Sequence, residues 1–133
     1  TLVYPFADDA DAAALLPAIE RELGVFAPFE VSVRATGRFP ELLYLRPDPP
    51  EPFVEMTEAL TRAFPEFPPY GGAFDEIVPH ITVAGGDSKL LDRIEASLDV
   101  DVRVRVERAW LVHDTAEGWR RHTAFPLNGR TRA

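Results

Sequence analysis

The chain has 133 residues, which is the size of one domain and enough to bury a core. Its 46% hydrophobic and 27% charged residues are ordinary for a soluble globular protein. No apolar run approaches the ~18 residues that a membrane span needs, so we expect no membrane role. The sequence has no cysteine, which excludes disulfides and thiolate metal sites and suits the cytoplasm. It begins Thr-Leu-Val-Tyr, with neither Met nor a signal peptide, and we expect residues upstream to be missing.

The net charge of −8 argues against binding to long nucleic acids, which needs a basic face. The charge is uneven along the chain. Residues 1–88 carry 5 Arg/Lys against 15 Asp/Glu, whereas residues 89–133 carry 9 against 7. Local positive potential near the C-terminal third could still attract a small phosphate ester, although a solvated surface is the simpler interpretation.

The first 46 residues predict the order strand, helix, strand, strand. Thr1–Phe6 is an apolar, β-prone run. An acidic stretch then precedes an amphipathic helix that ends at Leu23 before a glycine. Phe29–Thr36 alternates apolar and polar residues, as a half-buried strand does, and Gly37 would allow the turn to a partner strand at Glu41–Arg46.

The rest of the chain predicts the same order again, after a Pro-rich loop and an extra helix. Its expected elements are a helix at Phe53–Phe64, a strand at Ile77–Ala84, a helix at 88–98 capped by Ser88, a strand from Val100 to Val112 with a bulge near Arg108, and a strand at Trp119–Leu127. The repeated order predicts a single α+β domain over residues 1–133. It would have two similar lobes, approximately 1–50 and 75–128, each built on an antiparallel sheet.

The segment Pro79-His80-Ile81-Thr82-Val83 holds the residues best suited to chemistry. Side chains alternate along a strand, so His80 and Thr82 would face a cleft while Ile81 and Val83 anchor the strand in the core. An imidazole transfers protons near neutral pH, and a hydroxyl two residues away can hold a phosphate oxygen.

The His-x-Thr triplet alone is a weak signal, because a lone strand histidine is more often structural than catalytic. A second triplet, His113-Asp114-Thr115, lacks the alternating apolar anchors. We interpret it as a turn.

The first strand makes the His80 triplet more specific. Thr1-Leu2-Val3-Tyr4-Pro5-Phe6 resembles the tail of the first His-x-Thr motif of the two-histidine phosphoesterases, the superfamily of the 2′-5′ RNA ligases and cyclic nucleotide phosphodiesterases. Pro79-His80-Ile81-Thr82-Val83 resembles the second motif of that family, at a plausible separation. The segments 29–33 and 39–45 resemble the strands that follow the first motif, so the resemblance covers essentially the whole chain.

The resemblance implies two pseudo-symmetric lobes with helices packed outside the sheets and a cleft between them. It implies a phosphodiesterase without metal or cofactor, acting on 2′,3′-cyclic phosphates or 2′-5′ linkages of RNA or nucleotides. His80 would be one catalytic residue, Thr1 and Thr82 would bind the phosphate, and the other histidine would stand two residues before Thr1. Thr82 is followed by Val-Ala-Gly-Gly, without the basic residue that some members place there, which weakens the ligase substrate class.

Several other residues have a structural and a functional interpretation. Tyr44, Tyr70 and Phe74 could stack on a base, although aromatic residues in such segments usually pack. Packing in the core is the expectation for Trp110 and Trp119. The remaining candidates are arginines on the polar face of the strand after residue 100, which could reach the cleft or stay in solvent: Arg103 and Arg105.

Three functions remain open from the sequence. The first is the metal-independent phosphodiesterase, with a small nucleotide or RNA end as substrate and a monomeric protein. The second is a non-catalytic relative that binds a nucleotide or a protein with the same cleft. The third is a metal-dependent hydrolase, for which His80, Asp75 and Asp87 would be the ligands. No His-x-x-x-His pattern or carboxylate cluster supports that site, so we expect no metal.

Overall fold

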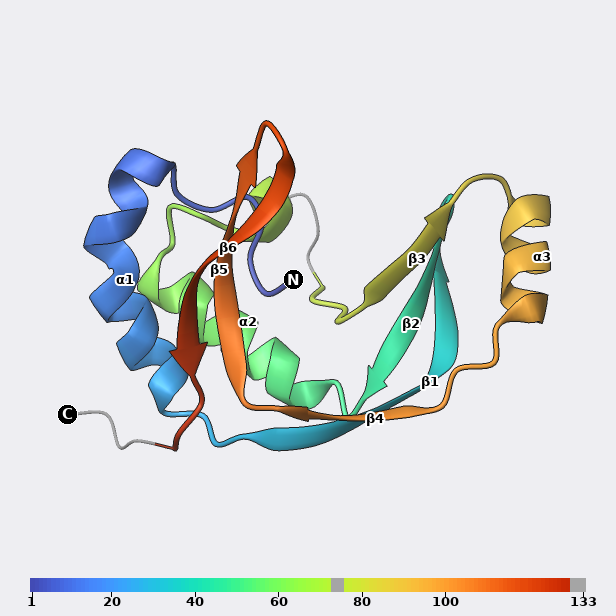
Figure 1. The fold of residues 1–133 in the computed structure, drawn as a ribbon, viewed down its shortest axis with the longest axis horizontal. Coiled ribbons are helices and arrows are strands. Elements are labelled where there is room, and N and C mark those ends of the chain that lie inside the picture. Colours follow the sequence, from blue (N-terminus) through green and yellow to red (C-terminus); the bar gives the residue numbers. More distant parts are fainter. Residues whose placement is uncertain (73–75, 130–133) are drawn as a thin grey trace.

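The computed structural model describes residues 1–72 and 76–129, and it places three α-helices and six strands in them (Figure 1). The helices are α1 (Asp9–Gly24), α2 (Glu51–Ala63) and α3 (Ser88–Ser97), and a 3-10 turn lies at Pro69–Gly72. The strands are β1 (Phe29–Phe39), β2 (Leu42–Asp48), β3 (Ile81–Gly85), β4 (Val102–Val106), β5 (Arg108–Thr115) and β6 (Gly118–Pro126). Among these helices, none combines the length and apolarity that crossing a bilayer requires.

The strands form two antiparallel sheets, which confirms the expected α+β fold with two lobes. Sheet A has the order β3-β2-β1-β4, and sheet B is the β5–β6 hairpin. Figure 1 shows α1 beyond the hairpin at one end of the molecule and α3 beyond sheet A at the other, with α2 between them. Each sheet therefore has a helix on its outer side.

Strand pairing divides the chain differently from the approximate lobes 1–50 and 75–128. Sheet A combines β1 and β2 with β3 and β4, so it draws on both halves of the chain. The expected strand at 100–112 is two strands, because the chain leaves sheet A at Glu107 and continues in sheet B. The phase slip near Arg108 marks this change of sheet. The bulge lies further on, between Leu111 and Val112.

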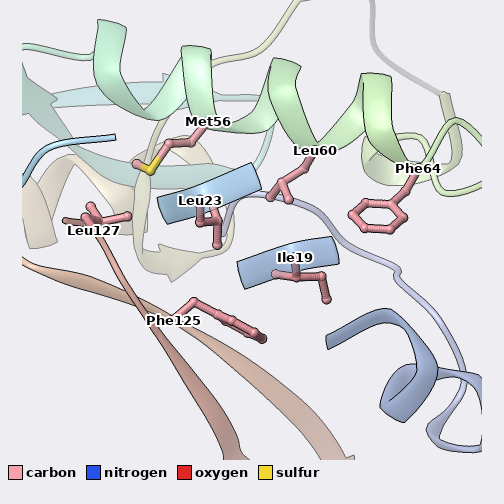
Figure 2. Close-up of a cluster of buried hydrophobic side chains, with 7 residues drawn as sticks. All are labelled: Ile19, Leu23, Met56, Leu60, Phe64, Phe125 and Leu127. Carbon is pink, nitrogen blue, oxygen red and sulfur yellow. The ribbon is translucent and has the colours of Figure 1, made fainter. Parts of the chain in front are cut away.

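The main core is formed where α1, α2 and sheet B meet (Figure 2). Ile19 and Leu23 come from the apolar face of α1, as their spacing of four residues predicts. The other members of this cluster, each no more than 7% exposed, are Met56, Leu60, Phe64, Phe125 and Leu127. The core therefore ties sheet B to both helices.

The expected strand at Thr1–Phe6 is wrong, because this segment pairs with neither sheet. The Leu2 carbonyl accepts a hydrogen bond from the buried Thr57 hydroxyl at 2.9 Å. The Tyr4 carbonyl accepts one from the Tyr70 backbone N–H. A strand needs a neighbour for its backbone groups, and here α2 and the loop at Tyr70 take two of those groups instead.

Two local assignments also differ from the sequence interpretation. Asp87 rather than Ser88 caps α3, because the Asp87 carboxylate accepts the Leu90 N–H at 2.8 Å. The stretch from His113 to Thr115 belongs to β5 rather than to a turn, since His113 pairs with Arg120 and Thr115 with Gly118.

A polar cluster joins α3 to β1. Arg38 donates to Asp92 at 2.8 Å and to Glu95 at 3.1 Å, and the Thr36 hydroxyl donates to Glu95. The Thr36 hydroxyl and the Arg38 guanidinium together hold the pKa of Glu95 below its ordinary value. The ionised Glu95 carboxylate therefore stabilises the docking of α3.

We predict that Glu95→Gln lowers the melting temperature at pH 7 and lowers it less at pH 3. A carboxyl whose pKa is lower in the folded state contributes stability above its unfolded value of about 4.3, and this contribution is lost as the pH falls through the folded value. Thermal unfolding followed by circular dichroism measures the melting temperature at each pH. The matched control is Glu58→Gln, a change of an exposed glutamate on α2. An equal deficit at both pH values would contradict the prediction.

Candidate functional site

His80 lies immediately before β3, and a backbone carbonyl fixes the orientation of its ring. Its Nδ1 atom is 2.8 Å from the Val78 carbonyl oxygen. A carbonyl oxygen only accepts, so Nδ1 carries the proton of the neutral ring and Nε2 is left as the proton acceptor. This is the tautomer that a general base acting through Nε2 requires.

Thr82 follows at the start of β3, which is an edge strand of sheet A. The Thr82 side chain is exposed, and its hydroxyl makes no hydrogen bond with another described residue. The predicted anchoring by Ile81 is wrong. Helix α3 contacts both β2 and β3 but leaves Ile81 48% exposed, whereas Val83 is half-buried.

Two aromatic side chains, Phe39 and Tyr44, lie against the His80 ring and are called the aromatic wall below. Phe39 and Tyr44 pack with ring centroids 4.5 Å apart, and both meet the His80 ring edge-on, at 5.2 and 5.7 Å. Tyr44 on β2 pairs with Thr82 on β3 and with Gly37 on β1. These three residues therefore form one row across three strands of sheet A. No pattern in the sequence marks Phe39 as a neighbour of His80.

Gly37 is necessary for this wall rather than for a turn. It lies within β1, and the turn is formed instead at residues 40–41, where Glu41 has a positive φ of 59°. A Cβ atom at Gly37 would lie 2.6 Å from both Cε2 and Oη of Tyr44. The Tyr44 ring can therefore lie across the β1 backbone only because residue 37 has no side chain.

Tyr44 and Tyr70, the predicted base-stacking residues, differ in accessibility. Tyr44 is 5% exposed, so it is a wall residue, whereas Tyr70 is 39% exposed. The Tyr70 ring lies 6.5 Å from the His80 ring at an interplanar angle of 29°. Tyr70 adopts φ 52° and ψ 35°, a left-handed conformation that disfavours a bulky residue. Burial raises the pKa of its phenol.

Thr1 lies at the start of the N-terminal segment, beside the main core. It lines a cavity of about 1110 Å³ between the N-terminal segment, the main core and sheet B, and among the described residues neither His80 nor Thr82 lines that cavity. No hydrogen bond between described residues joins Thr1 to His80 or Thr82. The predicted binding of one phosphate by Thr1 and Thr82 stays a prediction.

The tryptophans are placed differently from the sequence interpretation. Trp110 is 39% and Trp119 57% exposed, so neither belongs to the core. Periodicity identifies the two faces of a strand but does not say which of them is buried. Arg103 and Arg105 are both exposed, and Arg105 pairs with Glu107 at 3.1 Å.

The other histidines form a separate group on sheet B. The rings of His113 and His122 are 5.6 Å apart, and His113 Nδ1 is 3.5 Å from an Asp9 carboxylate oxygen. Among residues 1–72 and 76–129 no three histidines or carboxylates are grouped so as to hold a metal ion. Two residues named from the sequence, Phe74 and Asp75, lie outside the described residues.

The comparisons with known proteins agree with this architecture. A family profile described as "2'-5' RNA ligase superfamily" matches residues 1–118. The chain belongs to the 2′-5′ RNA ligase superfamily. Its chemistry at the family level is therefore that of a phosphoesterase-type enzyme. No curated protein sequence matches the chain.

A solved structure supports the fold independently. The chain superimposes on the protein TT0787 of Thermus thermophilus with a TM-score of 0.66 and 19% sequence identity, over 95% of this chain and 75% of that one. At this identity the likeness concerns the fold alone.

We predict that Gly37→Ala destabilises the protein by about 1–3 kcal/mol, the usual cost of overpacking a close contact. The new methyl group would push the Tyr44 ring away from β1 and with it the wall beside His80. Urea denaturation measures the stability. Gly85→Ala is the matched control, because its Cβ would meet the Glu41 carbonyl oxygen at an ordinary 3.5 Å. Equal stability of the two variants would contradict the assignment.

Proposed function

We propose that this protein is a metal-independent phosphodiesterase that acts on 2′,3′-cyclic phosphates or 2′-5′ linkages of RNA or nucleotides. The observation that carries the proposal is the Val78 carbonyl on His80 Nδ1, which leaves Nε2 as a proton acceptor. Membership of the 2′-5′ RNA ligase superfamily supports the reaction type.

The proposed step is hydrolysis of a phosphodiester. An oxygen of water attacks phosphorus, its proton passes to Nε2 of His80, and one phosphorus–oxygen bond to the ribose breaks. The leaving ribose oxygen takes up a proton from a second group, which acts as the general acid. A protonated imidazole on the leaving-group side would fill this role. The Thr82 hydroxyl donates a hydrogen bond to a phosphate oxygen, whose negative charge strengthens the bond.

The aromatic residues around His80 favour a nucleotide as the substrate. Phe39 and Tyr44 exclude water from one side of the His80 ring, which strengthens hydrogen bonds formed there. Tyr70 is the accessible ring beside His80 and can stack on the base attached to the reacting ribose.

A second function is supported by the placement of the other histidines. His113 and His122 contact each other on sheet B, whereas His80 contacts aromatic residues of sheet A and Tyr70 of the 3-10 turn that precedes β3. No described histidine therefore pairs with His80. A non-catalytic protein that binds a nucleotide against Tyr70 is the alternative.

The test uses 2′,3′-cyclic nucleotides and short 2′-5′-linked oligonucleotides in excess chelator. We predict that His80→Ala lowers the rate of product formation by about 10²–10⁴-fold, the usual contribution of a general acid or base. Thr82→Val keeps the shape of the side chain and is expected to lower kcat/KM by about 10–100-fold, through the lost bond to a charged group. His113→Ala is the matched histidine control and should leave the rate unchanged.

Three outcomes separate the functions. Turnover that survives His80→Ala overturns the proposal. Loss of turnover of the unaltered protein in chelator favours a metal-dependent hydrolase. Nucleotide binding without turnover, weakened by Tyr70→Ala, supports the binding protein.

A further inference from the structure

We propose that the exposed face of the β5–β6 hairpin binds the bases of a single-stranded RNA end whose terminal phosphate lies at His80. This rests on the proposed function and adds to it a second surface, which binds the bases beyond the terminal nucleotide. The hairpin face is defined by residues that alternate along the two strands: Arg108, Trp110, Val112, Asp114, Trp119 and Arg121.

These residues share one face because of the strand register. Val112 pairs with Arg121 and Asp114 pairs with Trp119, so these four side chains project to the same side of the hairpin. The opposite side is turned to the core, where Phe125 is 3% exposed. The hairpin face, by contrast, leaves Trp110, Val112 and Trp119 39%, 43% and 57% exposed.

A continuous series of contacts connects the hairpin face to His80. The Trp119 ring meets the Tyr4 ring edge-on with centroids 5.9 Å apart. The Tyr4 carbonyl accepts the Tyr70 backbone N–H, and the Tyr70 ring lies 6.5 Å from His80. Tyr70, Tyr4 and Trp119, which are 39%, 49% and 57% exposed, therefore lead from the candidate site to sheet B.

The charge of the hairpin face suits a phosphate backbone. The Arg121 guanidinium carbon lies 4.9 Å from the centroid of the Trp110 ring, a cation–π contact that holds the cation beside an exposed ring. Arg108 lies on the same face two residues before Trp110, with its guanidinium 3.7 Å from a carboxylate oxygen of Glu107. Asp114 is the carboxylate opposite Trp119. This face carries two arginines against one aspartate, whereas the whole chain has a net charge of −8.

This combination fits single-stranded RNA better than a protein partner. Exposed tryptophans beside arginine are the platform on which successive bases stack without sequence preference. The strongly negative remainder of the chain limits the bound length to a few nucleotides. On this face Arg108 and Asp114 lie at the two ends of the β5 row and Arg121 lies over the Trp110 ring, whereas the centre of a protein interface is depleted in charged residues.

Fluorescence gives a direct test, because the chain has two tryptophans and both lie on the hairpin face. The protein is titrated with oligouridylates of one to six nucleotides that end in a 2′,3′-cyclic phosphate. We expect tryptophan quenching and an affinity that rises with length to about four nucleotides. Trp119→Ala should weaken binding of the tetranucleotide at least about fivefold, the lower end for one stacked base, and leave the mononucleotide unaffected. Trp119→Phe should retain the binding.

Two further variants sharpen the test. Arg121→Gln should reduce the slope of log affinity against log salt by about 0.7, the value for one phosphate of a single strand. Val104→Ala, at an apolar residue 41% exposed on β4, is the matched control and should change nothing. Melting curves check that Trp119→Ala stays folded.

The outcomes separate this proposal from the proposed function. An affinity that does not depend on length, or an equal loss for mononucleotide and tetranucleotide in Trp119→Ala, overturns the hairpin proposal. Dimerisation that Trp119→Ala abolishes without changing oligonucleotide binding assigns the face to a second copy and also overturns it. Length-dependent binding in a protein whose turnover survives His80→Ala keeps the hairpin proposal and rejects the catalytic role of His80.

Discussion

The antiparallel pairing of β1 with both β2 and β4 is the constraint on which sheet A depends. Because side chains alternate along a strand, this pairing gives β1 two different faces. Thr36 and Arg38 hold α3 on one face. On the other, Gly37 makes room for Tyr44, and Phe39 packs on Tyr44 and His80. A register shift of one residue would place the ionic cluster against His80 and the wall under α3.

The N-terminal segment links the two lobes without joining either sheet. Its backbone carbonyls are bonded to Thr57 on α2 and to Tyr70. Its Phe6 ring packs on the rings of Phe64 and Phe67, with centroids 5.5 and 4.9 Å apart. The conformation of Tyr70 beside His80 is therefore coupled to the anchoring of this segment, although the two are more than sixty residues apart in sequence.

The sequence was most informative where one local pattern decides the structure. The apolar stripes of α1 and α2 predicted both helices and their buried faces. The motif around His80, together with the segment at 1–6, identified the family that the profile match confirms. Strand pairing and the choice of buried face depend on residues far apart in the sequence, so a local pattern does not predict them. The segment at 1–6 looks like a strand but has no pairing partner, and the exposure of Trp119 depends on which face of sheet B meets the helices. The role of Gly37 becomes visible only once the turn is centred on residues 40–41, which sets Tyr44 opposite it.

The position of β3 at the edge of sheet A has a consequence for local unfolding. β3 pairs with β2 alone and has five residues, so few backbone hydrogen bonds hold it in place. Segments of this kind open more often than the strands at the centre of a sheet, and their amides exchange hydrogen faster. The Val78 carbonyl that orients His80 lies just before this strand. The proton-accepting form of the ring is thus set by a carbonyl next to an edge strand, which is the kind of segment that opens locally without global unfolding.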